Sequence, residues 1–132
     1  MIAVDTNVLA RLFVTDNEKQ HAAAVRFFSA RSSADRAFVS LAVQAELVWL
    51  LAQTLNFPLE RVRAALAAML SSADFEIEHR ELLEAAVEAM SAKQLDLADF
   101  LIAGMAKKVG CSATVTFDKD AAKYISGMEL LK

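Results

Sequence analysis

Short apolar runs alternate with longer helical segments along the chain, and this alternation constrains the fold more than any other feature of the sequence. The short runs are rich in β-branched and aromatic residues, which favour strands, whereas apolar residues recur at helical spacing between them. Strands separated by helices predict right-handed crossovers and a parallel sheet covered on both faces. We therefore predict an α/β fold, namely a three-layer α/β/α domain with a central, mainly parallel sheet of about four to five short strands.

The predicted elements follow one another with little room for linkers. Three local signals mark helix ends: Ser40 as an N-cap, Pro58 at the first position of a helix, and Gly110 directly after one. The predicted strands span residues 2–4, 36–39, 75–77, 113–117 and 129–131. The predicted helices span residues 6–13, 18–31, 40–55, 58–70, 80–90, 97–109 and 119–124.

Composition narrows the class of protein. The chain has 132 residues, which predicts a single domain over 1–132. Hydrophobic residues make up 56% and charged residues 23%, a balance that excludes a disordered chain. The formal net charge is −3, which excludes a protein that holds nucleic acid by a broad basic face. A phosphate-bearing ligand would have to be bound locally.

The sequence also indicates the cellular compartment of the protein. The single cysteine, Cys111, cannot form an internal disulfide, and we expect it to be a small buried residue. The first residues show no leader pattern, so we expect a cytoplasmic protein. The apolar segment 37–59 contains one charged residue, Glu46, but also Gln, Asn and Pro, which argues against a membrane span.

Two acidic residues follow predicted strands directly. Asp5 comes after the first strand and Asp118 after the strand at 113–117. Open parallel sheets bind their ligands at the carboxyl ends of the strands. The sequence therefore predicts that these two carboxylates share one edge of the sheet.

Two further acids lie inside apolar helical segments. Glu46 has only apolar residues at the positions three and four away, which predicts that it points inward with Trp49 in the core. Asp99 is surrounded by apolar neighbours, with Asp96 three residues earlier. A buried carboxylate must be protonated, paired or bound to a cation. No Lys or Arg lies within three residues of Asp5, Glu46 or Asp99.

Convergence of these four acids would be costly without a cation. Two carboxylates ~5 Å apart at an effective dielectric constant of ~20 repel each other by ~3 kcal/mol, and four charges form several such pairs. Oxygen ligands without histidine or cysteine suit Mg²⁺ or Mn²⁺. The pattern thus points to a divalent metal site.

A simpler interpretation exists for three acidic residues. Asp5, Asp96 and Asp118 each directly precede a predicted helix, where an aspartate caps the free backbone N–H groups. For each of them, capping is as good an explanation as metal binding. Capping does not account for Glu46 or Asp99, which lie within helices.

Four segments of the chain together resemble the PIN domain family, and within it the VapC-type ribonuclease toxins. These segments are VDTNVL at 4–9, AEL at 45–47, DLADFLIA at 96–103 and TFD at 116–118. Asp5, Glu46, Asp99 and Asp118 stand at the positions of the family's catalytic acids. Asp96 and Asp120 match less constant acidic positions. The resemblance covers nearly the whole chain, and its specificity lies in the order and spacing of the four motifs.

The resemblance implies an endoribonuclease that hydrolyses RNA phosphodiester bonds with Mg²⁺ or Mn²⁺. Asp5, Asp99 and Asp118 would be metal ligands, and Glu46 would act in the second sphere or at a second ion. Thr6, Asn7 and Thr116 would orient these carboxylates or their waters. The family further implies a homodimer and a small VapB-like antitoxin, whose C-terminal segment lies in a groove between the first helices.

Two other functions remain open. One is a non-catalytic binding module with the same fold. The other is a different Mg²⁺-dependent phosphate hydrolase in which Asp5 is phosphorylated. The second has less support, because Asn7 stands where a second acid is expected and only Lys119 follows the strand at 113–117.

Overall fold

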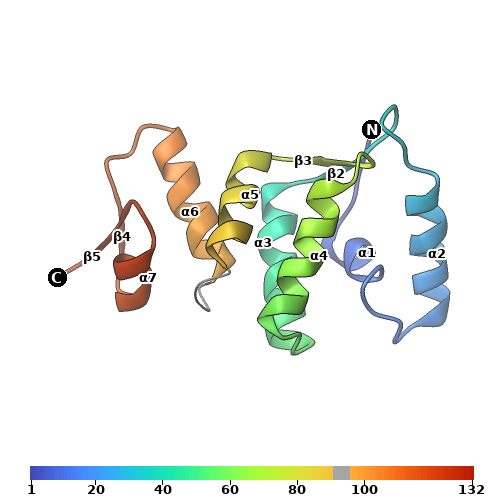
Figure 1. Ribbon diagram of the computed structural model, residues 1–132, viewed down its shortest axis with the longest axis horizontal. Helices are drawn as coiled ribbons and strands as arrows, with labels where there is room; N and C mark the ends of the chain where they lie inside the picture. Colours follow the sequence, from blue (N-terminus) through green and yellow to red (C-terminus); the bar gives the residue numbers. More distant parts are fainter. Residues whose placement is uncertain (91–95) are drawn as a thin grey trace. The chain divides into compact units, whose positions relative to one another are not determined.

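The computed structural model describes residues 1–90 and 96–132 (Figure 1). The chain folds as two compact units. The first unit is Met1–Arg80 and the second is Glu81–Lys132. Each unit contains its own parallel sheet of short strands together with helices. The predicted α/β class is confirmed, and the architecture is consistent with an α/β/α fold. That residues 1–132 form a single domain stays a prediction.

The first unit is built on three parallel strands in the order β1-β2-β3. Ile2 of β1 pairs with Ala37 of β2, which in turn pairs with Phe75 of β3. Helices connect each strand to the next, as parallel pairing requires. The elements are β1 (Ile2–Ala3), α1 (Thr6–Ala10), α2 (Glu18–Ser29), β2 (Ala37–Val39), α3 (Leu41–Trp49), the π-helical turn η1 (Leu50–Thr54), α4 (Leu59–Ser71) and β3 (Phe75–Ile77).

The central strand β2 lies at the core of this unit. Ala37 and Val39 are fully buried. Phe28 of α2 packs against Phe75 of β3, with their ring centroids 5.5 Å apart. Apolar burial on this scale supplies most of the driving force for folding. Strand β2 and the helices around it therefore hold the first unit together.

Two of the predicted helix ends can be checked in this unit. The Ser40 hydroxyl accepts a hydrogen bond from the backbone N–H of Val43 (3.2 Å), which confirms the predicted N-cap of α3. Pro58 is the N-cap residue of α4 rather than its first helical residue, so the helix begins one residue later than predicted. Its backbone is extended (ψ 152°), so the helix starts only at Leu59.

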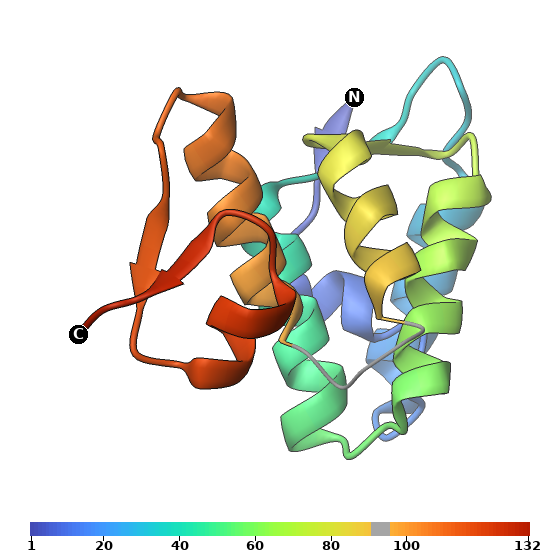
Figure 2. The same ribbon diagram turned by 60° about the vertical axis from the view of Figure 1, so that its left-hand side comes forward.

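The described residues of the second unit form a two-stranded parallel sheet and helices, of which α5 begins at the last residue of the first unit. Figure 2 shows α7 in the connection from β4 to β5. Thr114 of β4 pairs with Met128 of β5. Gly110 follows the C-cap of α6 with a φ of +93°, a conformation that favours glycine and confirms the predicted helix end. The elements are α5 (Arg80–Ala89), α6 (Leu97–Lys108), β4 (Thr114–Thr116), α7 (Lys119–Tyr124) and β5 (Met128–Leu130).

Helices α5 and α6 are joined by a close approach and an ion pair. A Cβ atom placed on Gly104 would lie 2.8 Å from a methyl carbon of Leu82, so the glycine makes room for this leucine. The ammonium group of Lys108 contacts the carboxylate of Glu81. Ala103, Ala121, Ile125 and Met128 form a buried hydrophobic cluster.

The division of the strands differs from the prediction of one central sheet. Among the described residues, the strands form a three-stranded and a two-stranded sheet. Both sheets are parallel, as predicted. The strands contain only two or three residues each, so few backbone hydrogen bonds join each pair. The pattern of apolar residues along the sequence locates the strands. It does not specify which strands become neighbours in a sheet, because tertiary packing decides this.

Two predictions of burial are wrong. Cys111 is exposed, because it follows Gly110 in the turn after α6. Trp49 is 59% exposed although it lies in an apolar helix.

Among residues 1–90 and 96–132, no helix combines the length and the apolar character needed to cross a membrane.

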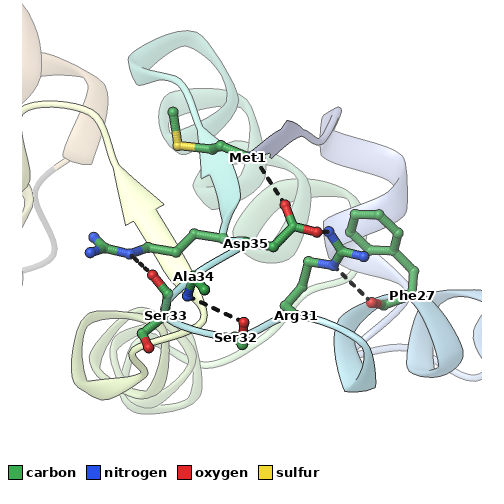
Figure 3. A network of polar contacts seen from close by, with 8 residues as sticks. Met1, Phe27, Arg31, Ser32, Ser33, Ala34 and Asp35 are labelled. Atoms are coloured by element: carbon green, nitrogen blue, oxygen red, sulfur yellow. Dashed lines mark hydrogen bonds and ion pairs between the residues drawn. The ribbon is translucent and has the colours of Figure 1, made fainter.

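A polar network anchors the loop before β2 in the first unit (Figure 3). The carboxylate of Asp35 lies 3.0 Å from the Met1 amine and 2.8 Å from the guanidinium of Arg31. Arg31 also donates to the carbonyl of Phe27 (3.2 Å) and lies over its ring. The hydrogen bond from the Met1 amine and the charge of Arg31 lower the pKa of Asp35 below its ordinary value of 3.8, against the opposing effect of burial.

We expect Asp35 to contribute to acid sensitivity. Its folded-state pKa is lower than its unfolded-state pKa, so its contribution to stability is present above the unfolded value and is lost as pH falls through the folded value. Asp35→Asn should therefore flatten the dependence of the unfolding free energy on pH below about pH 4. Urea titrations between about pH 2 and 6 measure this slope. Equal slopes for variant and parent would contradict the prediction.

Candidate functional site

Three of the candidate acids are N-caps of helices in the structure. Asp5 caps α1, Asp96 caps α6 and Asp118 caps α7, each through its Oδ1 atom. The capping interpretation is therefore confirmed for all three. The backbone N–H groups that donate to these atoms belong to Val8 (3.1 Å), Ala98 (3.0 Å), Asp120 (2.9 Å) and Ala121 (3.0 Å).

Capping leaves the second carboxylate oxygen of each of these residues available. Within the described part of the chain, the Oδ2 atoms of Asp5, Asp96 and Asp118 accept no hydrogen bond, and no Lys or Arg pairs with them. The positive end of the helix dipole favours the negative charge at these positions. Each carboxylate is thus oriented by its helix while one oxygen stays free for a ligand.

Asp99 differs from the capping residues because it lies inside α6 and is half-buried. Burial raises the pKa of Asp99 above 3.8, and the negative charges of Asp96 and Asp118 raise it further. These three carboxylates of the second unit therefore interact electrostatically. The structure thus brings Asp99 and Asp118, which are far apart in sequence, within range of each other.

The prediction that Glu46 points inward is wrong, because its side chain is exposed. The buried face of α3 carries Gln44, Leu47 and Val48. Glu46 lies on the exposed side together with Trp49. Helix α3 is apolar on nearly every side, so the spacing of its apolar residues could not show which face is buried.

The residues predicted to support the acids take different positions. Thr116 accepts a hydrogen bond from the backbone N–H of Asp118 through its hydroxyl (3.0 Å), which positions the start of α7. Asp120 is exposed and contacts Asp118 through its own backbone N–H. Thr6 is buried, with 4% of its surface exposed, whereas Asn7 is exposed.

The four candidate catalytic acids are divided between the two units. Asp5 and Glu46 belong to the first unit, in which α1 packs against α3. Asp99 and Asp118 belong to the second. In the parts of the chain that the structure describes, no group of three or more His, Cys, Asp or Glu side chains has a geometry that could hold a metal ion. The meeting of all four acids stays a prediction.

A groove of about 700 Å³ lies beside Asp5 in the first unit. Its walls come from β1, α1 and α2 and include Val8 and Phe27. Arg11 also lines the groove and is ion-paired with Asp16. The Nε atom of Arg11 is buried and has no hydrogen-bond partner among the described residues. The groove thus combines apolar walls with an arginine and a carboxylate.

The comparison with protein families decides which family this chain belongs to. The profile described as PIN domain matches residues 2–125, which includes nearly all of both units. The chain belongs to the PIN domain family. PIN domains are generally nucleases that use divalent metals, so the match supports an enzyme of the hydrolase class. A comparison with curated proteins gives no match. In this PIN domain, Asp5, Glu46, Asp99 and Asp118 all lie within the matched residues.

Proposed function

We propose that this PIN domain is a metal-dependent endoribonuclease that hydrolyses RNA phosphodiester bonds, and that it is the toxin of a VapBC-type toxin–antitoxin pair. The observation that supports this proposal most directly is the state of Asp99. Its pKa is raised by burial and by the charges of Asp96 and Asp118, so a cation bound there would relieve an unfavourable interaction. Perturbed carboxylates of this kind are typical of functional sites.

The chemistry of the donor set fits Mg²⁺ or Mn²⁺. Asp5, Asp99 and Asp118 would hold the metal through carboxylate oxygens, the ligands that these ions prefer. The free Oδ2 atoms of Asp5 and Asp118 are suited to this role, because their Oδ1 atoms are occupied by capping. A bound metal would act as a Lewis acid toward the phosphate and would lower the pKa of a bound water.

The side chains of the chain itself would orient the reactants. Capping holds the carboxylates of Asp5 and Asp118 in one rotamer each, which limits the entropy lost when a ligand binds. The carboxylate of Glu46, which is exposed, would act in the second sphere of the metal or as a ligand of a second ion. Water would add to phosphorus in line with the leaving ribose oxygen, which would take up a proton from solvent as its bond to phosphorus breaks, so no covalent enzyme intermediate would form.

The groove between α1 and α2 suits the proposed antitoxin. Its apolar walls would take the side chains of an extended or helical segment, and Asp5 at its edge would be covered by that segment.

The proposal also includes a homodimer. In the second unit, Val115, Phe117 and Leu131 are exposed apolar side chains on or beside β4 and β5. Exposed apolar side chains that lie close together commonly mark protein interfaces.

A cleavage assay with defined metal content tests the proposed function. Purified protein freed of bound partners is incubated with a structured RNA in Mg²⁺, in Mn²⁺ and in EDTA. We expect cleavage with either metal and none in EDTA. Cleavage that survives both EDTA and Asp5→Asn would reveal a contaminating nuclease and remove the enzymatic assignment. RNA binding without cleavage in either metal would favour the binding module instead.

A further inference from the structure

Trp49 is unusual because a large aromatic side chain lies open to solvent. Its exposed fraction is 59%, whereas tryptophan is highly buried on average in folded proteins. Its indole forms no ring contact, hydrogen bond or ion pair with any residue in 1–90 or 96–132. It is also the one tryptophan in the sequence. More than half of this large aromatic side chain is therefore available to a ligand.

The position of Trp49 relative to Glu46 is well defined. Both side chains are exposed, and they lie three residues apart on α3, where helical neighbours have Cβ atoms about 5–6 Å apart. Side chains on a helix lean toward its N-terminus. Trp49 and Glu46 are therefore neighbours on the exposed side of α3.

Two features of the surroundings indicate the kind of ligand. The other exposed residues along this side of the helix are Ala42, Glu46 and Gln53, so Trp49 is a single aromatic ring among small and polar side chains. A single exposed ring can bind one flat aromatic group of a ligand. A protein partner would instead need a contiguous apolar patch on this surface. The helix also changes directly after Trp49 into the π-helical turn η1, a feature frequent at functional sites.

We infer that Trp49 is a stacking platform for an unpaired nucleobase of the RNA substrate, next to Glu46. This inference rests on the proposed function and specifies its substrate as RNA with an unstacked base. Aromatic side chains bind unpaired bases in this way without reading their identity. An overall charge of −3 limits the electrostatic contribution to RNA binding, so stacking would supply an important part of the affinity.

The fluorescence of Trp49 reports directly on this contact, because no other tryptophan contributes. We would titrate the protein in EDTA, where cleavage is blocked, with an adenosine decamer RNA and with a ribose–phosphate decamer that lacks bases. We expect quenching by the first and not by the second. Trp49→Leu should weaken RNA binding by about 5- to 150-fold, and Trp49→Phe should restore most of it. Tyr124→Leu, which removes an exposed aromatic ring of the second unit, serves as the matched control.

Each outcome bears on the inference separately from the proposed function. Equal quenching by the two decamers, or equal RNA affinity of Trp49→Leu and the parent, would overturn stacking even if the protein cleaves RNA. Base-dependent quenching in a protein that never cleaves RNA would support stacking and contradict the nuclease. A Trp49→Leu variant with normal RNA affinity but an altered oligomeric state would overturn the inference and identify a protein contact.

Discussion

Asp99→Asn is expected to lower RNA cleavage by more than about 100-fold. Loss of a residue that only supports a metal ligand already lowers activity by up to about 100-fold, and Asp99 would be a ligand itself. The same variant should be more stable than the parent at neutral pH without metal. The pKa of Asp99 is higher in the folded state than in the unfolded state. Its favourable contribution to folding stability is therefore present below the ordinary pKa of 3.8 and is lost as the pH rises through the folded-state pKa. At pH 7 the charged form is unfavourable, and asparagine removes it, with a gain of up to about 1 kcal/mol because the group is partly solvated.

The two effects are measured on one preparation. Initial cleavage rates give the loss of activity, and urea unfolding in EDTA at pH 7 gives the stability. Asp74→Asn is the matched control, since Asp74 is also a half-buried aspartate but lies outside the candidate site. Lower metal-free stability of Asp99→Asn would show that Asp99 makes a structural hydrogen bond. Unchanged cleavage would exclude Asp99 from the active site.

Added Mg²⁺ or Mn²⁺ is expected to stabilise the parent protein strongly. A ligand that binds the folded state alone stabilises it by about 2.7 kcal/mol at about 100 times its Kd, which corresponds to several degrees in Tm. Asp118→Asn should abolish this stabilisation while leaving the metal-free Tm equal to that of the parent or slightly higher, since it also removes a charge that opposes Asp99. The reason is that asparagine is as good an N-cap as aspartate, so α7 keeps its cap and loses only the charged oxygen.

Thermal unfolding with and without metal checks this prediction. KCl at the same ionic strength separates specific binding from charge screening. Asp118→Ala adds a further comparison, because it removes the cap as well and should lower the metal-free Tm, by about 1 kcal/mol in stability. A parent protein that Mg²⁺ and Mn²⁺ do not stabilise, or an Asp118→Asn variant stabilised as much as the parent, would contradict a metal site at Asp118.

The acids show how far reasoning from sequence reaches. Asp5, Asp96 and Asp118 each permitted two interpretations, and the structure confirms capping while leaving an oxygen free for a ligand. Burial of Asp99 among apolar neighbours is confirmed in part, since it is half-buried. The predicted face of Glu46 is wrong, because α3 is apolar on nearly every side and the spacing of its apolar residues does not show which side is buried. The exposure of Trp49 was missed for the same reason.

The sequence by itself determined the order of strands and helices, most of the residues that cap the helices, and the family to which the chain belongs. These properties depend on local spacing and on side-chain contacts with the nearest backbone, and both are written into short segments. Only the tertiary structure decided which face of α3 is buried, how the strands divide between two sheets, and that Asp99 interacts with Asp118. These depend on which distant segments pack together, because burial and electrostatic coupling are properties of the surroundings that folding creates.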